Sequence, residues 1–158
     1  YAGGEALDPF LEYTDKGVFV WCRSSNPGAR EFQDLTLSLQ DASMTLFQWV
    51  AQQAVQWNTR GNVGLVIGAT YPDELKEVRS CCPGVPFLIP GVGAQGGQID
   101  RAVALGTDDE GRSAIINASR QVIYASKDRH SFPEKSRRVA HGLRERINGV
   151  LREEGKGW

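Results

Sequence analysis

The residues best suited to chemistry lie in a glycine-rich stretch from Pro90 to Gly97, with the sequence PGVGAQGG. Its glycines allow positive φ angles and let the backbone approach a ligand closely, which a β-carbon would obstruct. Backbone N–H groups in such a turn, next to the free N–H groups at the start of a helix, form an anion site. The Gln95 side chain adds a neutral amide that can donate to a phosphate oxygen. The stretch therefore predicts a phosphate-binding loop.

Two other interpretations of these glycines are open. The spacing of Gly91, Gly93 and Gly96 matches the G-x-G-x-x-G motif of dinucleotide-binding proteins. That motif requires an acidic residue at the end of a second strand about 20 residues later, whereas residues 108–110 here fall in a polar loop. A nicotinamide site is therefore disfavoured, and a tight turn without a ligand is the remaining alternative.

Apolar runs of strand length alternate with amphipathic stretches along the chain. We expect strands at 18–22, 63–67, 85–89 and 113–117. We expect the main helices at 41–57, 73–81, 98–106 and 133–154. Continuously apolar strands that alternate with helices are typical of a parallel sheet covered by helices. The pattern therefore predicts an α/β protein.

Two α/β architectures fit four such units, an open doubly wound sheet and half of a (β/α)₈ barrel. A whole barrel usually takes about 250 residues, and this chain has 158. The glycine-rich stretch follows the third expected strand, and Ser119 and Arg120 follow the fourth. If these are strands seven and eight, both loops occupy the usual phosphate position of the barrel. We therefore expect the C-terminal half, about four β/α units, of a TIM (β/α)₈ barrel.

Composition narrows the class of partner. The net charge is −1, with both signs spread through the chain, so no basic surface for nucleic acid is expected. No apolar run approaches 18 residues, so no membrane partner is expected either. Cys22, Cys81 and Cys82 lack zinc-ligand spacing, so we expect no metal site and free thiols in the cytoplasm. The chain begins at Tyr1, without an initiator methionine, so we expect that residues precede it in the full protein.

Four segments in this order resemble the longer subgroup of orotidine 5′-phosphate decarboxylases. They are YAGGEAL at 1–7, RSSNPG at 23–28, GNVGLVIGAT at 61–70 and PGVGAQGG at 90–97. The resemblance is to the C-terminal half of that barrel, from strand five to strand eight, and it covers residues 1–126. Residues 127–158 are then expected to form a C-terminal helix that packs on the barrel.

The resemblance implies which residues bind phosphate. Gln95, with Gly96 beside it, is similar to the family's phosphate-gripping glutamine on the loop that folds over the nucleotide. Arg120 is similar to the arginine after strand eight that binds the phosphate dianion, with the Ser119 amide beside it. A guanidinium suits this role because it presents two donors to two phosphate oxygens.

The resemblance also implies which residues bind the base. Ser25 is similar to the serine after strand five that contacts the pyrimidine ring, although Ser24 or Asn26 can take that place. Pro90 and Val92 are expected to line the apolar wall near the base. The family uses neither a metal ion nor an organic cofactor, so none is expected here.

The chain departs from the family in its catalytic residues. The family's chemistry depends on an Asp-Lys-Asp-x-Lys-x-x-Asp set, mostly on strand three and its loop, and no segment here has that pattern. We therefore expect no catalytic residue in this chain. It is expected to supply the phosphate- and base-binding half of a carbon–carbon lyase. That enzyme converts orotidine 5′-phosphate to UMP and CO₂ in pyrimidine biosynthesis, and the chain alone is expected to be inactive.

The expected partners are orotidine 5′-phosphate or UMP and the missing N-terminal half of the barrel. The sequence leaves open whether the completed enzyme is a monomer or a homodimer. A different class of function is a non-catalytic phosphate- or nucleotide-binding α/β module. Against the module, half a barrel has two unpaired edge strands, at 18–22 and 113–117, which invite association. Another phosphate-binding barrel enzyme, of the aldolase or isomerase kind, is disfavoured by the length of the matching segments.

Overall fold

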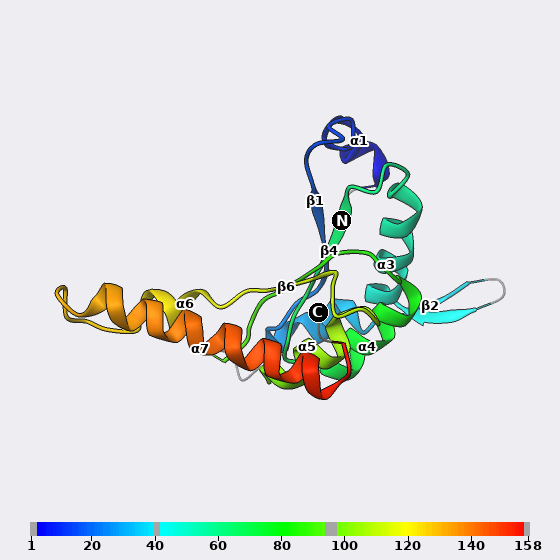
Figure 1. The fold of residues 1–158 in the computed structure, drawn as a ribbon. Helices are drawn as coiled ribbons and strands as arrows, with labels where there is room; N and C mark the ends of the chain where they lie inside the picture. Colours follow the sequence, from blue (N-terminus) through cyan, green and yellow to red (C-terminus); the bar gives the residue numbers. More distant parts are fainter. Residues whose placement is uncertain (1–2, 40–41, 94–97, 157–158) are drawn as a thin grey trace.

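A computed structural model describes residues 3–39, 42–93 and 98–156 of the chain. Its centre is a parallel four-stranded sheet in the order β1-β4-β5-β6, shown in Figure 1. The strands are β1 (Val18–Arg23), β4 (Val63–Ile67), β5 (Phe87–Ile89) and β6 (Ala114–Ile116). All four strands lie where the apolar runs predicted them, and the expected α/β class is confirmed.

Three long helices return the chain from the carboxyl end of one strand to the amino end of the next, and a fourth comes after the last strand. They are α3 (Leu46–Trp57), α4 (Pro72–Cys81), α5 (Ile99–Gly106) and α7 (Phe132–Glu153). Short helices fill the connections: η1 (Gly4–Ala6), α1 (Asp8–Leu11), η2 (Pro27–Ala29), α2 (Arg30–Gln33) and α6 (Ser119–Ile123). A hairpin of β2 (Thr36–Ser38) and β3 (Ser43–Thr45) precedes α3.

The core lies between one face of the sheet and helices α3, α4 and α5. Alternate residues of a strand point to opposite faces, and Leu65, Phe87 and Ile89 are fully buried toward the helices. The other face is open: Trp21 is 56% exposed and Ile115 is 51% exposed. Within the described residues, no helix covers this second face.

The expected helix at 41–57 begins later than predicted, at Leu46. The backbone N–H of Thr45 donates to Gln48 Oε1 at 2.8 Å, an arrangement that favours a helix start at this point. The preceding residues pair instead as the β2–β3 hairpin, which the sequence did not predict because its strands are only three residues long. Asp41, where the predicted helix began, lies outside the described residues.

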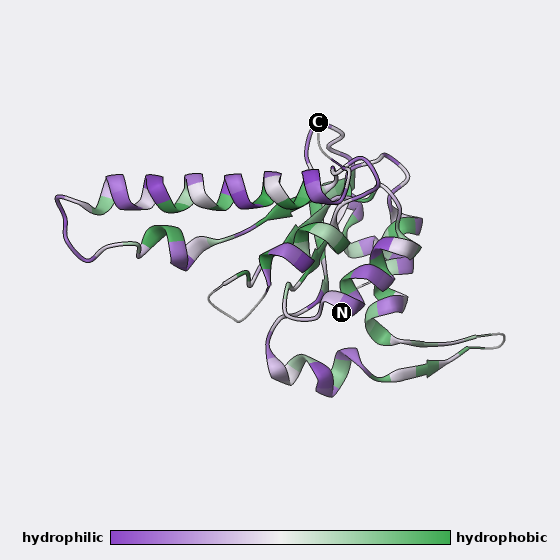
Figure 2. Ribbon diagram, turned by 60° about the horizontal axis from the view of Figure 1, so that its bottom comes forward, coloured by the Kyte–Doolittle hydropathy of each residue, from purple (hydrophilic) through white to green (hydrophobic). Residues whose placement is uncertain are grey.

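The C-terminal helix α7 lies along α5 and α6 and reaches well beyond the sheet (Figure 1). Its hydrophobic residues lie on the side turned toward α6 and the sheet (Figure 2), and Val150 and Leu151 are buried. Arg146 pairs with both carboxylate oxygens of Asp100 on α5, at 2.7 and 2.8 Å. The helix that was expected beyond residue 126 is present, and a domain boundary at that position stays a prediction. No helix among the described residues is both long and apolar enough to cross a membrane.

Candidate functional site

The candidate site lies where the strands of the sheet end. Because all four strands are parallel, the loops after β1, β5 and β6 lie together at the carboxyl ends of the strands. They line a cavity of about 230 Å³ that is open to solvent. The cavity is lined by Trp21, Ser25, Pro90, Gly91, Val92, Asn117, Ser119 and Arg120.

This cavity brings together every predicted site residue that the structure describes. These residues are Ser25 after β1, Pro90 and Val92 after β5, and Ser119 and Arg120 after β6. The other two predicted residues, Gln95 and Gly96, lie outside the described residues. Phosphate and pyrimidine contacts stay predictions for all seven.

The turn after β5 has the backbone geometry expected of the glycine-rich stretch. Gly91 and Gly93 have φ angles of 91° and 74°, which a residue with a β-carbon rarely adopts. A β-carbon at Gly93 would also lie 2.8 Å from the side-chain oxygen of Gln121. Val92, between the two glycines, is buried and forms an apolar wall of the cavity.

The loop after β1 distinguishes between the candidate base-binding residues. The indole Nε1 of Trp21 donates to the hydroxyl oxygen of Ser24 at 2.9 Å. Ser25 lines the cavity, whereas Ser24 and Asn26 are not among its lining residues. Of the three alternatives that the sequence left open, the geometry favours Ser25.

The loop after β6 carries the only cation among the described residues that line the cavity. The backbone N–H of Asn117 donates to the carbonyl of Ile89, and the Ser119 hydroxyl donates to Asn117 Oδ1 at 3.2 Å. These contacts fix the start of α6, on which Arg120 lies. Arg120 is exposed and, within the described part of the chain, forms no ion pair. Its guanidinium is therefore open to an anion that enters the cavity.

Sequence reasoning missed the role of Trp21. Trp21 falls in the apolar run that predicted a strand at 18–22, and its side chain points to the uncovered face of the sheet and lines the cavity. The signal was present in the alternation along β1, where Phe19 and Trp21 fall on one face and Cys22 is fully buried on the other. Asn117, which was not among the predicted site residues, also lines the cavity.

The cavity is equipped for binding more than for proton transfer. Among its described lining residues there is no lysine, histidine, aspartate or glutamate. The described residues also contain no group of three or more His, Cys, Asp or Glu placed to hold a metal ion. The arrangement offers one guanidinium, hydroxyl groups and an apolar wall, which suit a ligand with an anionic end and a flat ring.

Known proteins resemble this chain over nearly its whole length. The model of the orotidine 5′-phosphate decarboxylase / HUMPS family matches residues 1–132. The orotidine 5′-phosphate decarboxylase of Thermomicrobium roseum is 46% identical over 154 residues, which cover 97% of this chain and 54% of that protein. The corresponding enzyme of Halobacterium salinarum is 46% identical over 149 residues, which cover 94% of this chain and 55% of that protein.

Two solved structures share the fold. An OMP decarboxylase of Leishmania donovani superposes with a TM-score of 0.74 at 34% identity, over 92% of this chain and 54% of that one. A putative orotidine-monophosphate decarboxylase of Toxoplasma gondii superposes with a TM-score of 0.77 at 32% identity, over 96% of this chain and 57% of that one. The chain thus spans about half the length of the relatives it matches, and its fold is the C-terminal half of the barrel. The chain belongs to the orotidine 5′-phosphate decarboxylase / HUMPS family.

Proposed function

We propose that this chain is the phosphate- and base-binding half of an orotidine 5′-phosphate decarboxylase. The whole enzyme takes up a proton and releases CO₂ from orotidine 5′-phosphate to form UMP. The observation that carries this proposal is the single cavity that collects Ser25, Pro90, Val92, Ser119 and Arg120 from three separate loops. Family membership and the names of the relatives support the choice of substrate.

In this proposal the two ends of the cavity have different tasks. Arg120 and the backbone of Ser119 bind the phosphate, with Gln95 and Gly96 of the loop after β5 completing the grip. Ser25 contacts the pyrimidine ring, and Pro90 and Val92 form the wall beside it. Binding energy from a phosphate that does not react can order the site around the reacting carbon, and so contributes to the rate.

The proton donor and the carboxylates come from the other half of the barrel. The apolar face of the sheet supports this division, because Phe19, Trp21 and Ile115 are exposed there. Exposed apolar surface of this kind is typical of a binding interface. The first four β/α units of the barrel are the partner that we propose for this face.

A cytoplasmic location is also part of the proposal. Cys22, Cys81 and Cys82 are free thiols, which accord with a reducing compartment.

Reconstitution of the barrel tests the proposal. The 158-residue chain is assayed alone and after co-expression with the first half of the Thermomicrobium roseum relative. We expect the chain alone to bind UMP without turnover, and the reconstituted barrel to release CO₂ from orotidine 5′-phosphate. Sedimentation of that barrel then distinguishes a monomer from a homodimer.

Two results would overturn the proposal. Decarboxylation by the chain alone would place the acid–base set within it. Failure of both the chain and the reconstituted barrel to bind UMP would remove the nucleotide site. Binding of UMP without turnover in the reconstituted barrel would instead favour a non-catalytic nucleotide-binding module.

A further inference from the structure

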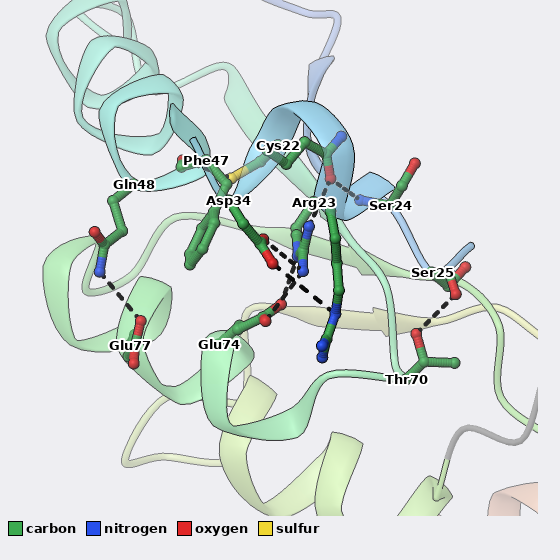
Figure 3. A network of polar contacts seen from close by, with 12 residues as sticks. Cys22, Arg23, Ser24, Ser25, Asp34, Phe47, Gln48, Thr70, Glu74 and Glu77 are labelled. Atoms are coloured by element: carbon green, nitrogen blue, oxygen red, sulfur yellow. Dashed lines mark hydrogen bonds and ion pairs between the residues drawn. The ribbon is translucent and has the colours of Figure 1, made fainter. Parts of the chain in front are cut away.

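A buried arginine stands at the end of β1, directly before the loop that carries Ser25. Arg23 is fully buried, and its Nε and Nη2 donate to the two carboxylate oxygens of Glu74 at 2.5 and 3.0 Å. Nη2 also lies 2.9 Å from Asp34 Oδ1, which accepts no hydrogen bond from the described residues, so that contact is Coulombic. The rings of Phe47 and Tyr71 lie 5.3 and 4.5 Å from the guanidinium carbon. Figure 3 shows this ion-pair network.

The guanidinium remains charged in this environment. Burial lowers the pKa of Arg23, but the hydrogen bonds to Glu74 and the negative charges of Glu74 and Asp34 outweigh burial and raise the pKa. The contacts come from three elements: Arg23 ends β1, Glu74 lies in the first turn of α4, and Asp34 follows α2. A charge held from several sides has little freedom to move, so Arg23 is a fixed point at the base of the loop.

Gln33 connects this fixed point to the loop. Its buried Oε1 accepts a hydrogen bond from Arg23 Nη1 at 3.2 Å and another from the backbone N–H of Ser24 at 2.9 Å. A single amide oxygen therefore holds both the guanidinium and the first peptide of the loop. Without that oxygen, the Ser24 N–H would have to find another acceptor in a partly buried position.

The opposite flank of the loop is held by the turn after β4. The Thr70 hydroxyl donates to the carbonyl of Ser25 at 3.0 Å (Figure 3), and the Gly68 N–H donates to the carbonyl of Arg23 at 2.8 Å. A β-carbon at Gly68 would lie 2.7 Å from the Ser25 β-carbon, so the two turns are in close contact. The backbone of Ser25 is thus fixed from both sides. Ser119 and Arg120, at the other end of the cavity, are the first residues of α6 and do not take part in these contacts.

We infer that Gln33 and Thr70 are positioning residues for recognition of the base. They hold Ser25 at the wall of the cavity, whereas the phosphate end is built separately on the β6–α6 connection. The inference rests on the proposed function, in which Ser25 faces the pyrimidine ring. It adds that the two ends of the site are positioned independently. Gln33 and Thr70 affect the affinity for the base and leave the affinity for the sugar phosphate unchanged.

The test compares two ligands that share the ribose phosphate and differ at C1′, where UMP has the base and ribose 5-phosphate has a hydroxyl. Isothermal titration measures the affinities of UMP and of ribose 5-phosphate for the 158-residue chain and for the reconstituted barrel. We expect Thr70→Val, which removes one hydrogen bond to the loop, to weaken UMP binding about tenfold. Gln33→Leu removes two hydrogen bonds and should weaken UMP binding at least as much. Binding of ribose 5-phosphate should stay unchanged. Arg23 itself is left in place, because its removal would leave the carboxylates of Glu74 and Asp34 without their cation.

Thr107→Val is the matched control. The Thr107 hydroxyl donates to the carbonyl of Val103 at 2.8 Å, so the same change removes the same kind of bond away from the cavity. It should leave both affinities unchanged. An equal loss for both ligands in Gln33→Leu and Thr70→Val, or no loss for either, would overturn the inference while the proposed function stands. Absence of binding by the unsubstituted protein, alone and reconstituted, would refute the proposed function and the inference with it.

Discussion

Ser25 and Arg120 line the same cavity, although they follow β1 and β6, the two strands at opposite edges of the sheet. A ligand that touches both must bridge the loops at the carboxyl ends of the sheet. A nucleoside monophosphate has this form, with a flat base at one end and a dianion at the other. The two ends of the site can therefore be tested separately.

Arg120→Ala should weaken binding of UMP by about 1.5–3 kcal/mol, the usual worth of a hydrogen bond to a charged group. Binding of uridine, which lacks the phosphate, should hardly change. Isothermal titration of both ligands checks this expectation. The control is Arg129→Ala, an exposed arginine outside the cavity, which should leave UMP binding unchanged. Equal losses of UMP and uridine affinity in Arg120→Ala would exclude a phosphate-specific role.

The two faces of the sheet should respond differently to truncation. Leu65 is fully buried under the helices, and Leu65→Ala should lower the free energy of unfolding by about 2–5 kcal/mol. Ile115 is 51% exposed on the open face, so Ile115→Ala should lower the free energy of unfolding by less than about 1 kcal/mol. Urea unfolding of the chain measures both. In the reconstituted barrel Ile115→Ala should become more costly, and an unchanged cost there would argue against an interface on this face.

The three thiols should react at very different rates. Burial raises the pKa of Cys22 to about 12 and that of Cys82 to about 11, whereas Cys81 is exposed. Because the thiolate is the nucleophile, the folded chain at pH 8 should show one fast-reacting thiol toward an aromatic disulfide, and three in denaturant. Cys81→Ser should remove the fast phase. A second fast thiol in the folded chain would contradict the burial of Cys22 and Cys82.

The same shifts predict how stability depends on pH. In the unfolded chain Cys22 ionises around its ordinary pKa of 9.0, and in the folded chain only near 12. Its folded pKa is raised, so its contribution to stability is complete below pH 9 and is lost as the pH rises toward 12. The free energy of unfolding should fall from about pH 9 upward, by up to about 1.4 kcal/mol per pH unit for each such thiol. Cys22→Ala should flatten this fall, and an unchanged slope would show that other groups cause it.

Arg79 should be required for stability at the amino ends of the strands, on the side of the sheet away from the cavity. Its guanidinium donates to the carbonyls of Cys82, Val85, Gly106 and Ser113 at 2.7–3.2 Å. Burial lowers its pKa to about 10, so it is still charged at neutral pH. Arg79→Met leaves these carbonyls without their donor and should lower the free energy of unfolding by about 3 kcal/mol or more.

The control for Arg79 is an arginine on the surface. Arg101 pairs with Asp73 at 2.7 Å in an exposed position, and Arg101→Met should change the free energy of unfolding by no more than about 1 kcal/mol. Urea unfolding measures both variants. Similar small losses for the two would show that the carbonyls around Arg79 find water or other donors when it is removed.

The sequence by itself determined the four strands of the sheet, the main helices and the family. The four strands, the main helices and the glycine turn after β5 were predicted because they depend on short-range patterns: apolar runs, helical periodicity and the tolerance of glycine for positive φ. The segments that carry Ser25, Pro90 and Arg120 could be placed near one another because the carboxyl ends of parallel strands lie on the same side of a sheet. The short β2–β3 hairpin and α6 were missed because their segments are too brief to show a period.

Only the tertiary structure decided which side chains face the cavity. Ser24 and Ser25 are the same residue type at adjacent positions, and the fold places Ser25 at the cavity and Ser24 against Trp21. Arg23 was part of a recognised motif, but its burial against Glu74, 51 positions away along the chain, has no local signal. Local patterns specify how the backbone folds. The partner of a buried charge and the direction of a side chain depend on residues that only folding brings together.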